Sequence, residues 1–332
     1  VLNSPVGIYP ITASLGTLDA VNYDFTFEQG LLTVTKAPLT LTAENKTRKY
    51  GENNPALTFQ ATGFMNSETW TSSGITGQPL ISTEANASSA AGKYDIILSN
   101  GSLNGGNYEL SFVNGKLDIG KALVTVKAED KSRIYGSANP QLTATYTGFV
   151  NGENLASSGI TGAPALNTIA TASSRAGIYA ITSGVGTLSA GNYEFQYTEG
   201  ILTIGKATLN ISAENKSRKY GEANPSLTYT LNGFVLGESL SNSDVSGLPV
   251  LSTSASATSA VGSYDIVTGI GNLSSNNYSF VLNKGTLTIG KALLSITADN
   301  KSRKYGETNP ALTFQASGFK NGQVWASSGI NG

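Results

Sequence analysis

The residues of this sequence best suited to chemistry are tyrosines, and most of them recur at a fixed spacing. Twelve of the 15 tyrosines fall in three rows, and one constant interval separates successive members of each row. The rows are Tyr9, Tyr94, Tyr179 and Tyr264; Tyr23, Tyr108, Tyr193 and Tyr278; and Tyr50, Tyr135, Tyr220 and Tyr305. Exposed aromatic rows could stack on sugar rings, because a flat apolar face with a polar edge suits a carbohydrate. The alternating patterns around the tyrosines favour core packing at strand ends instead, with each hydroxyl bonded to a neighbouring loop.

A strip of alternating charges is the second candidate for binding. Its pattern, acid-x-Lys-x-Arg, recurs as Glu44, Lys46 and Arg48; as Glu129, Lys131 and Arg133; and as Glu214, Lys216 and Arg218. In one interpretation the strip is a ladder of lysine and arginine sites for anionic glycans. We favour a solvated strand whose charges prevent edge-to-edge aggregation and whose exposed ion pairs add little stability.

The two tryptophans suggest ligand binding until their spacing is considered. Trp70, Leu155, Leu240 and Trp325 follow one another at the same interval as the tyrosines. The position therefore requires a large apolar side chain rather than an indole. We expect it to pack in the core or against a neighbouring repeat.

The composition excludes several kinds of chemistry. The 332 residues contain no cysteine and no histidine, which removes thiolates, the commonest general base and the commonest transition-metal ligand. Every notable polar feature recurs, so no singular set of nucleophile, base and electrostatic stabiliser stands out, and we expect no enzyme. We also expect no cofactor. Calcium at the joints between repeats is the one metal that we considered, although acidic residues are sparse and the Asp-x-Asp-x-Asp-Gly spacing does not occur.

The charge pattern argues against nucleic acids and membranes as partners. The 21 basic and 22 acidic residues are thinly spread and leave a net charge of −1, so no basic patch is available for nucleic acid or anionic lipid. No apolar run approaches the roughly 20 residues of a membrane-spanning helix. Nothing at Val1 resembles a secretory signal, and we expect the sequence to begin inside a larger protein.

A sequence repeat must position all of these residues. The segment that begins at Lys36 returns at Lys121, Lys206 and Lys291, which defines an 85-residue period, the difference between positions 121 and 36. Residues 36–120, 121–205 and 206–290 are complete copies, residues 1–35 are the tail of an earlier copy, and residues 291–332 are the head of a later one. Self-similarity at a fixed period predicts a tandem array of structural modules.

Each copy carries strand signals with a period of two. Leu39 and Leu41 alternate with polar residues and should face inward. Near the end of each copy, a Tyr-x-Phe segment, which is Tyr108-x-Leu110 in the copy 36–120, precedes a turn at a glycine such as Gly115 and a final strand. This pattern predicts a hairpin whose glycine has a positive φ. Six or seven short strands with little helix predict an all-β fold, and an immunoglobulin-like sandwich and a β-grasp-like sheet are both open. The last strand of one copy leads into the next copy without a flexible tether, which predicts a stiff, elongated array.

Several of these motifs together resemble a known family. They are Lys-Ala at 206–207, Ala-Glu-Asn-Lys-Ser-Arg-Lys-Tyr-Gly at 213–221, Asn-Pro at 224–225, Gly-Phe at 233–234, Gly-Ser-Tyr-Asp-Ile at 262–266 and Asn-Tyr-Ser-Phe at 277–280. The chain resembles tandem MBG domains of the YGX type, which occur in large bacterial surface proteins such as filamentous-haemagglutinin-like adhesins. The resemblance implies an extracellular location on the bacterial cell surface and an adhesin-associated role. It carries over no catalytic residues.

Three functions are consistent with such an array. We favour a non-enzymatic stalk or spacer that projects a distal adhesive domain. Alternatively, each module binds a glycan, mucin or another surface protein weakly, and repetition supplies avidity. In a third alternative, the part-copies at 1–35 and 291–332 complete one another between two chains, so that the protein associates with itself.

Overall fold

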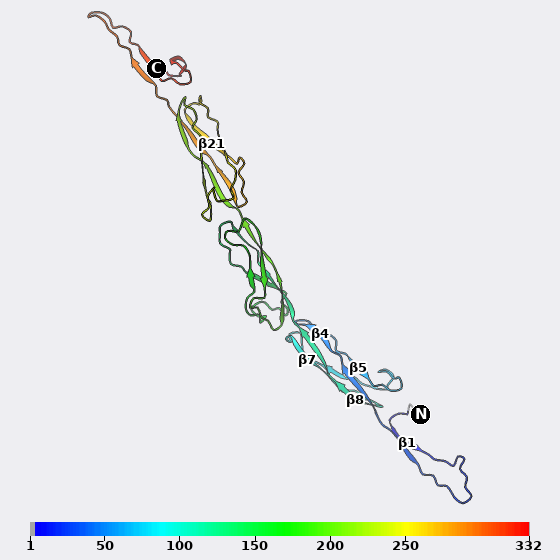
Figure 1. Cartoon of the computed structure of the whole chain (residues 1–332). Coiled ribbons are helices and arrows are strands. Elements are labelled where there is room, and N and C mark those ends of the chain that lie inside the picture. Colours follow the sequence, from blue (N-terminus) through cyan, green and yellow to red (C-terminus); the bar gives the residue numbers. More distant parts are fainter. Residues whose placement is uncertain (1–3, 332) are drawn as a thin grey trace. The chain divides into compact units, whose positions relative to one another are not determined.

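The computed structural model describes residues 4–331, which form strands joined by turns (Figure 1). Within that range the one helical element is a single 3-10 turn, Trp325–Ser327. The chain divides into two compact units. The first comprises the residues up to Ala128 with Ala144–Leu166 and Thr182–Glu199, and the second comprises Glu129–Thr143, Asn167–Ile181 and the residues from Gly200 onward. The division between units therefore falls inside the repeat 121–205.

The repeat 36–120, which lies in the first unit, shows how a module is built. Its strands are β3 (Ala37–Ala43), β4 (Lys46–Lys49), β5 (Phe59–Thr62), β6 (Leu80–Ser82), β7 (Gly92–Ser99), β8 (Tyr108–Val113) and β9 (Gly115–Gly120). They form a three-stranded sheet with the order β5-β3-β8 and a four-stranded sheet with the order β4-β9-β7-β6. Strands β4 and β7 mark one end of the repeat and β5 and β8 the other (Figure 1).

The other complete repeats have the same strands in the same order. The repeat 121–205 contains β10 (Ala122–Ala128), β11 (Lys131–Ile134), β12 (Ala144–Thr147), β13 (Ala165–Asn167), β14 (Gly177–Gly184), β15 (Tyr193–Thr198) and β16 (Gly200–Gly205). The repeat 206–290 contains β17 (Ala207–Ala213), β18 (Lys216–Lys219), β19 (Tyr229–Asn232), β20 (Val250–Thr253), β21 (Gly262–Gly269), β22 (Tyr278–Asn283) and β23 (Gly285–Gly290). The part-copies hold two antiparallel pairs, β1 (Gly7–Ile11) with β2 (Gly30–Val34) and β24 (Ser295–Ala298) with β25 (Phe314–Ser317).

One parallel ladder connects the two sheets of the repeat 36–120. Ala37 pairs with Tyr108 in one sheet and Lys46 pairs with Leu117 in the other, so the offset along the sequence is the same in both. Strands β3 and β4 thus continue each other across a bend, as do β8 and β9. The same offset pairs Ala207 with Tyr278 in the repeat 206–290.

The predicted hairpin at Gly115 is wrong. Strands β8 and β9 lie in different sheets and do not pair with each other. Gly115 and its counterpart Gly285 do not have a positive φ. A Cβ atom on Gly115 would instead lie 2.7 Å from the carbonyl oxygen of Ala43. Glycine is required here because the two strands of the ladder approach closely where they bend from one sheet into the next.

The alternation predicted for the first strand of each repeat is confirmed. Leu39 and Leu41 are fully buried and pack in one cluster with Ile96, Leu117 and Ile119 of the four-stranded sheet. In the part-copy 291–332 the corresponding Ile296 is 57% exposed, because that segment contains no counterpart of β8 and β9 to cover it.

The prediction of an all-β tandem array of modules, one for each period of the sequence, is confirmed. The sequence left a sandwich and a β-grasp sheet both open, and the strand order bears on this choice. In the repeat 36–120, two sheets contribute to one core, as in a sandwich, but each contains a parallel pair, whereas the sheets of an immunoglobulin sandwich are antiparallel.

Candidate functional site: the joint between neighbouring repeats

Two tyrosines from different repeats share one carboxylate in the first unit. The hydroxyl of Tyr50 donates to Oε1 of Glu153 at 2.6 Å, and the hydroxyl of Tyr193 donates to Oε2 at 2.6 Å. The two rings meet edge to face, with centroids 5.6 Å apart. Tyr50 belongs to the repeat 36–120, whereas Glu153 and Tyr193 belong to the next repeat. The carboxylate therefore ties two neighbouring modules together.

The second unit contains the same arrangement one period later. Tyr135 and Tyr278 donate to the two carboxylate oxygens of Glu238 at 2.7 Å and 2.6 Å. Their ring centroids are 5.7 Å apart at an interplanar angle of 82°. Because both joints repeat the same hydrogen bonds and ring geometry, the triad of Tyr, Glu and Tyr is a built feature of the array.

A tight turn places the first tyrosine. The Tyr50 amide donates to the carbonyl oxygen of Gly120, which ends the preceding ladder. Gly51 follows with a φ of +86°, and a Cβ atom there would lie 2.5 Å from Cγ2 of Val150. Only glycine meets both demands, the left-handed conformation and the close approach. The glycine of the Tyr-Gly pair is therefore required by its contact with the next repeat, and not only by the fold of its own repeat.

The following repeat forms the site that receives this turn, which we call the socket, from Val150, Glu153 and Tyr193. Strand β15 begins at Tyr193, whose hydroxyl also accepts a hydrogen bond from the Val150 amide at 3.2 Å. Asn192 adds a further link, because its Oδ1 accepts the Ala91 amide of the preceding repeat at 3.0 Å. Lys49 and Glu194 form an ion pair of 3.0 Å at the exposed rim. The hydrogen bonds of the joint stabilise it more than this ion pair does, because exposed ion pairs contribute little.

The joint is held by one carboxylate that accepts hydrogen bonds from the tyrosines of two repeats. A carboxylate can accept several hydrogen bonds, and bonds to an ionised group are worth about 1.5–3 kcal/mol each. Hydrogen bonding to Glu153 is the largest cause that raises the pKa of Tyr50. Burial, followed by the bond to Glu153, raises the pKa of Tyr193 to about 12. Both phenols are therefore held in the protonated, donating form.

We expect the joints to resist alkaline pH until their tyrosines ionise. Burial and the bond to Glu238 raise the pKa of both Tyr135 and Tyr278 to about 12. An unfolded tyrosine titrates near pH 10. The folded pKa is thus the higher one, so this stabilisation is complete below about pH 10 and is lost as the pH rises through about 12. Phenolate absorbance recorded together with circular dichroism tests this. Complete titration near pH 10 with the fold intact would contradict it.

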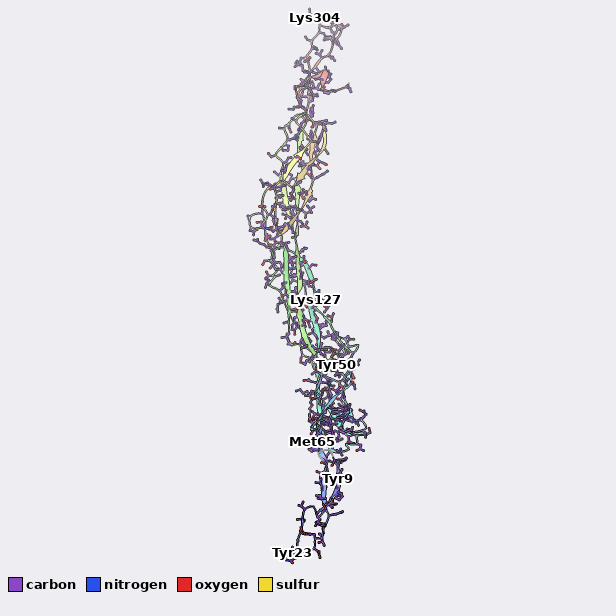
Figure 2. All side chains as sticks on the ribbon, turned by 90° about the vertical axis from the view of Figure 1, so that its right-hand side faces the viewer. Tyr9, Tyr23, Tyr50, Met65, Lys127 and Lys304 are labelled. Carbon is purple, nitrogen blue, oxygen red and sulfur yellow. The ribbon has the colours of Figure 1, made fainter. Side chains whose placement is uncertain are left out.

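Core packing, predicted for the tyrosines, is confirmed in the complete repeats for the row of Tyr108 and for Tyr50 and Tyr135, whereas Tyr220 is half-buried. Tyr108, Tyr193 and Tyr278 are buried, as are Tyr50 and Tyr135. Tyr23 is 79% exposed and lies in the loop that joins β1 and β2, away from Tyr9 (Figure 2). The third row follows the predicted hydroxyl-to-loop pattern: each hydroxyl donates to the carbonyl oxygen four residues earlier, for Tyr9, Tyr94, Tyr179 and Tyr264.

The shared carboxylate is the functional residue that the sequence reasoning missed. Glu68, Glu153 and Glu238 recur at the period of the repeat, with Gln323 at the fourth position. This recurrence in the sequence could have marked the glutamate as a residue with a role in every joint. The bonds themselves join residues 103 and 40 positions apart, which no local pattern indicates.

The charged strip is less exposed than the sequence suggested. Strand β4 is an edge strand, as the favoured interpretation requires. However, Arg48 and Arg218 are only 7% exposed. Arg48 donates to Oδ1 of Asn54 at 2.7 Å and to the carbonyl oxygens of Lys49 and Asn86. These arginines fasten loops of their own module, so the assignment of Arg48 and Arg218 to a surface strip is corrected.

The lysine and the acid of the strip largely satisfy each other. Lys46 pairs with Glu44 at 2.9 Å, and the same pairs recur as Lys131 with Glu129 and Lys216 with Glu214. Hydrogen bonds from Thr58, then Lys46 and Gln60, lower the pKa of Glu44 to about 2. Arg133 is half-buried and bonds to Asn139 at 2.7 Å. Glycan binding by the strip, the alternative that the sequence analysis did not favour, stays untested.

The tryptophan position packs as predicted in the first complete repeat, whereas its counterparts Leu155 and Leu240 are exposed. Trp70 is half-buried, belongs to the shell of the core and meets Phe59 edge to face at 5.1 Å. Trp325 makes the same contact with Phe314 at 4.8 Å. Across residues 4–331, no group of three or more acidic side chains is placed to hold a metal ion. Calcium at the joints, which the sequence analysis considered and did not favour, stays untested.

The fold and the joints define a class: a tandem array of small β modules in which each module is fastened to the next. The model of the MBG domain (YGX type) family matches residues 39–118, 124–203, 209–288 and 294–329. The chain belongs to this family. Its matches follow the period seen in the sequence, and the invariant Tyr-Gly of the present repeats is the turn that enters the joint.

Other comparisons add little to this assignment. No curated protein matches the chain. Among solved structures, the chain is similar to the I9–I11 tandem of titin, with 10% identity and a TM-score of 0.23, over 76% of this chain and 100% of that one. It is also similar to Drosophila N-cadherin EC1–3, with 8% identity and a TM-score of 0.19, over 75% and 98% of the two chains. In the described part of the chain there is no helix that could cross a membrane.

Proposed function

We propose that these repeats are a non-enzymatic spacer, the stalk of a bacterial extracellular adhesin that holds a distal adhesive domain away from the cell. The observation that carries this proposal is the repeated joint. A spacer must hold its distal domain at a defined distance from the cell. A flexible tether between modules would not hold that distance. The joints of Tyr50 with Glu153 and of Tyr135 with Glu238 instead fix each module to its neighbour by hydrogen bonds from buried tyrosines.

Membership of the MBG family supports the location on the bacterial surface, and the recurrence of all polar features supports the absence of catalysis. The aromatic and charged residues that could serve a ligand are mostly engaged in the fold. Tyr50, Tyr193 and Arg48 are buried and bonded within the chain. We therefore infer that recurrence here preserves the geometry of the array rather than a series of ligand sites.

A distance measurement across one joint tests the spacer. The chain has no native cysteine, so spin labels on Lys93→Cys and Thr145→Cys report only on the joint of the first unit. Both positions are exposed, in β7 and β12. We expect a narrow distance distribution by pulsed electron resonance, which broadens when Glu153→Ala is added. Adding Glu194→Ala, at the exposed rim, should leave it narrow. A broad distribution in the chain with an intact joint would contradict a stiff spacer.

A further inference from the structure

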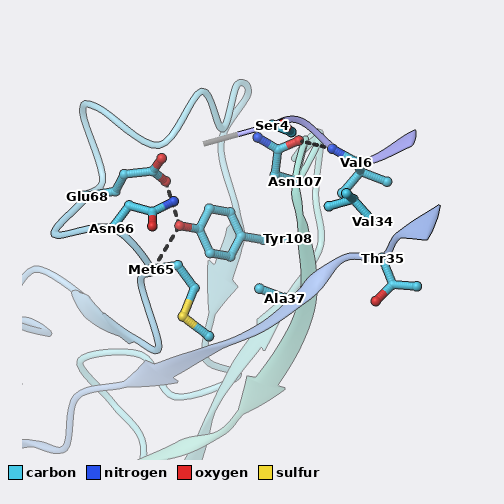
Figure 3. A pocket seen from close by; sticks show the side chains of 10 residues that line it. All are labelled: Ser4, Val6, Val34, Thr35, Ala37, Met65, Asn66, Glu68, Asn107 and Tyr108. Atoms are coloured by element: carbon cyan, nitrogen blue, oxygen red, sulfur yellow. Dashed lines mark hydrogen bonds between the residues drawn. The ribbon is translucent and has the colours of Figure 1, made fainter. Parts of the chain in front are cut away.

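The first and last strands of the repeat 36–120 form one continuous parallel ladder. The ladder starts where the Ala37 amide donates to the carbonyl oxygen of Asn107 at 3.0 Å, and it ends where the Tyr50 amide donates to that of Gly120 at 2.8 Å. Figure 3 shows its start, where Ala37 lies beside Tyr108. The bonded residues are 70 positions apart at both ends, the difference between 107 and 37 and between 120 and 50, so the register does not change along the ladder.

The bend between the two sheets does not interrupt these hydrogen bonds. Asn45 lies at the bend, between β3 and β4, and its Oδ1 atom accepts the Lys116 amide at 2.7 Å in place of a backbone carbonyl. In the repeat 206–290, Asn215 accepts the Thr286 amide in the same way at 2.8 Å. The side chain at this position therefore carries the ladder from one sheet into the next.

The ladder of the repeat 206–290 has the same two ends. The Ala207 amide donates to the carbonyl oxygen of Asn277 at 2.9 Å, and the Tyr220 amide donates to that of Gly290 at 2.9 Å. Each of the two compact units thus contains a complete repeat whose first and last strands are paired in parallel from end to end.

This ladder lies on the path that a pulling force takes through a repeat. The chain enters the repeat 36–120 at one end of the ladder, directly before β3, and leaves it at the other end, directly after β9. A force that separates these two points draws the strands past each other along their length. Because the hydrogen bonds of a parallel pair are evenly spaced, they share this load, and many must break together before the strands can slide.

The other strands of the repeat lie outside this path. Strand β5 pairs with β3 alone, and β6 pairs with β7 alone. Both ends of β5, β6 and β7 lead into loops of the same repeat, so a force applied to the ends of the repeat does not reach them before the ladder gives way.

We propose that each of these repeats is a force-bearing clamp, whose parallel ladder is loaded in shear when the array is pulled along the chain. A spacer needs only to hold its distance at rest, whereas the clamp keeps each repeat folded under tension. The clamp is a property of the single repeat, so it does not depend on the domain that the array carries.

Pulling one repeat in two directions tests the clamp. The chain has no cysteine, so handles on Lys36→Cys and Lys121→Cys load the ladder of the repeat 36–120 in shear within the full chain. Handles on Asn53→Cys and Lys121→Cys pull at one end of the ladder, and its bonds then open one at a time. All three positions are exposed. We expect a several-fold higher unfolding force in shear at the same pulling speed. Equal forces in the two directions would overturn the proposal.

Two matched substitutions show which contacts resist the force. Leu41 lies in the ladder and Leu98 lies in β7 beyond its pairing with β9, and both are buried in the same core cluster. Forced unfolding follows the unfolding rate, which responds to contacts that are lost before the barrier. Leu41→Ala should therefore lower the shear force, whereas Leu98→Ala should leave it unchanged although it lowers the stability in equilibrium unfolding. Equal losses of shear force in the two variants would contradict a ladder that breaks first.

The spacer and the clamp can fail separately. A narrow distance distribution across the joint, together with equal forces in the two pulling directions, would retain the spacer and exclude the clamp. A several-fold higher force in shear, together with a broad distance distribution, would retain the clamp and exclude the stiff spacer.

Discussion

Replacing Glu153 by alanine should loosen the joint of the first unit by about 3–5 kcal/mol. The change removes two charge-assisted bonds of about 1.5–3 kcal/mol each and leaves two buried hydroxyls without their acceptor. Those hydroxyls belong to Tyr50 and Tyr193. The Tyr50 amide, which donates to Gly120, reports on the joint, and its native-state hydrogen exchange should become faster by the corresponding factor.

The matched control for this variant is Glu194→Ala. Glu194 directly follows Tyr193 and forms an ion pair with Lys49, but both side chains are more than half exposed. Its removal should cost less than about 1 kcal/mol. Glu153→Gln should fall between the two, because an amide keeps one acceptor oxygen and loses the charge. If Glu153→Ala and Glu194→Ala have equal effects, the shared carboxylate does not fasten the joint.

Substituting Gly51 with alanine should be comparably damaging for a different reason. Two costs add: a left-handed conformation for a residue with a Cβ atom, about 1–2 kcal/mol, and overpacking, about 1–3 kcal/mol. The overpacking arises because the new methyl group would lie 2.5 Å from Cγ2 of Val150. We expect the sum, about 2–5 kcal/mol, to appear in equilibrium unfolding and as faster exchange at the Tyr50 amide.

Gly306→Ala separates the two contributions. Gly306 has nearly the same φ but open space around the position of the new methyl group, so it shows the conformational cost alone. Combining Gly51→Ala with Val150→Ala should recover part of the loss by making room. If Gly51→Ala and Gly306→Ala are equally mild, the close approach to Val150 is not a constraint on the joint.

The period, the all-β fold and the buried face of each first strand could be predicted because they are local properties of the chain. Side chains alternate across a strand, so Leu39 and Leu41 must share a face whatever the strand pairs with. The return of the same motifs after Lys36, Lys121 and Lys206 is visible in the letters alone. The prediction that Tyr108 and Tyr193 belong to the core rests on the same reasoning, and it holds.

Only the tertiary structure decided how the repeats are joined. The hairpin predicted at Gly115 failed because alternation reports which face of a strand is buried and says nothing of which strand lies beside it. The long-range parallel ladder, the close approach of Gly115 to Ala43 and the carboxylate of Glu153 between two tyrosines are contacts between distant positions. The sequence alone determined that the tyrosines recur and that Tyr108 and Tyr193 belong to the core. The structure decided that the hydroxyls of Tyr50 and Tyr193 meet on one glutamate, because that depends on register and on the neighbouring module.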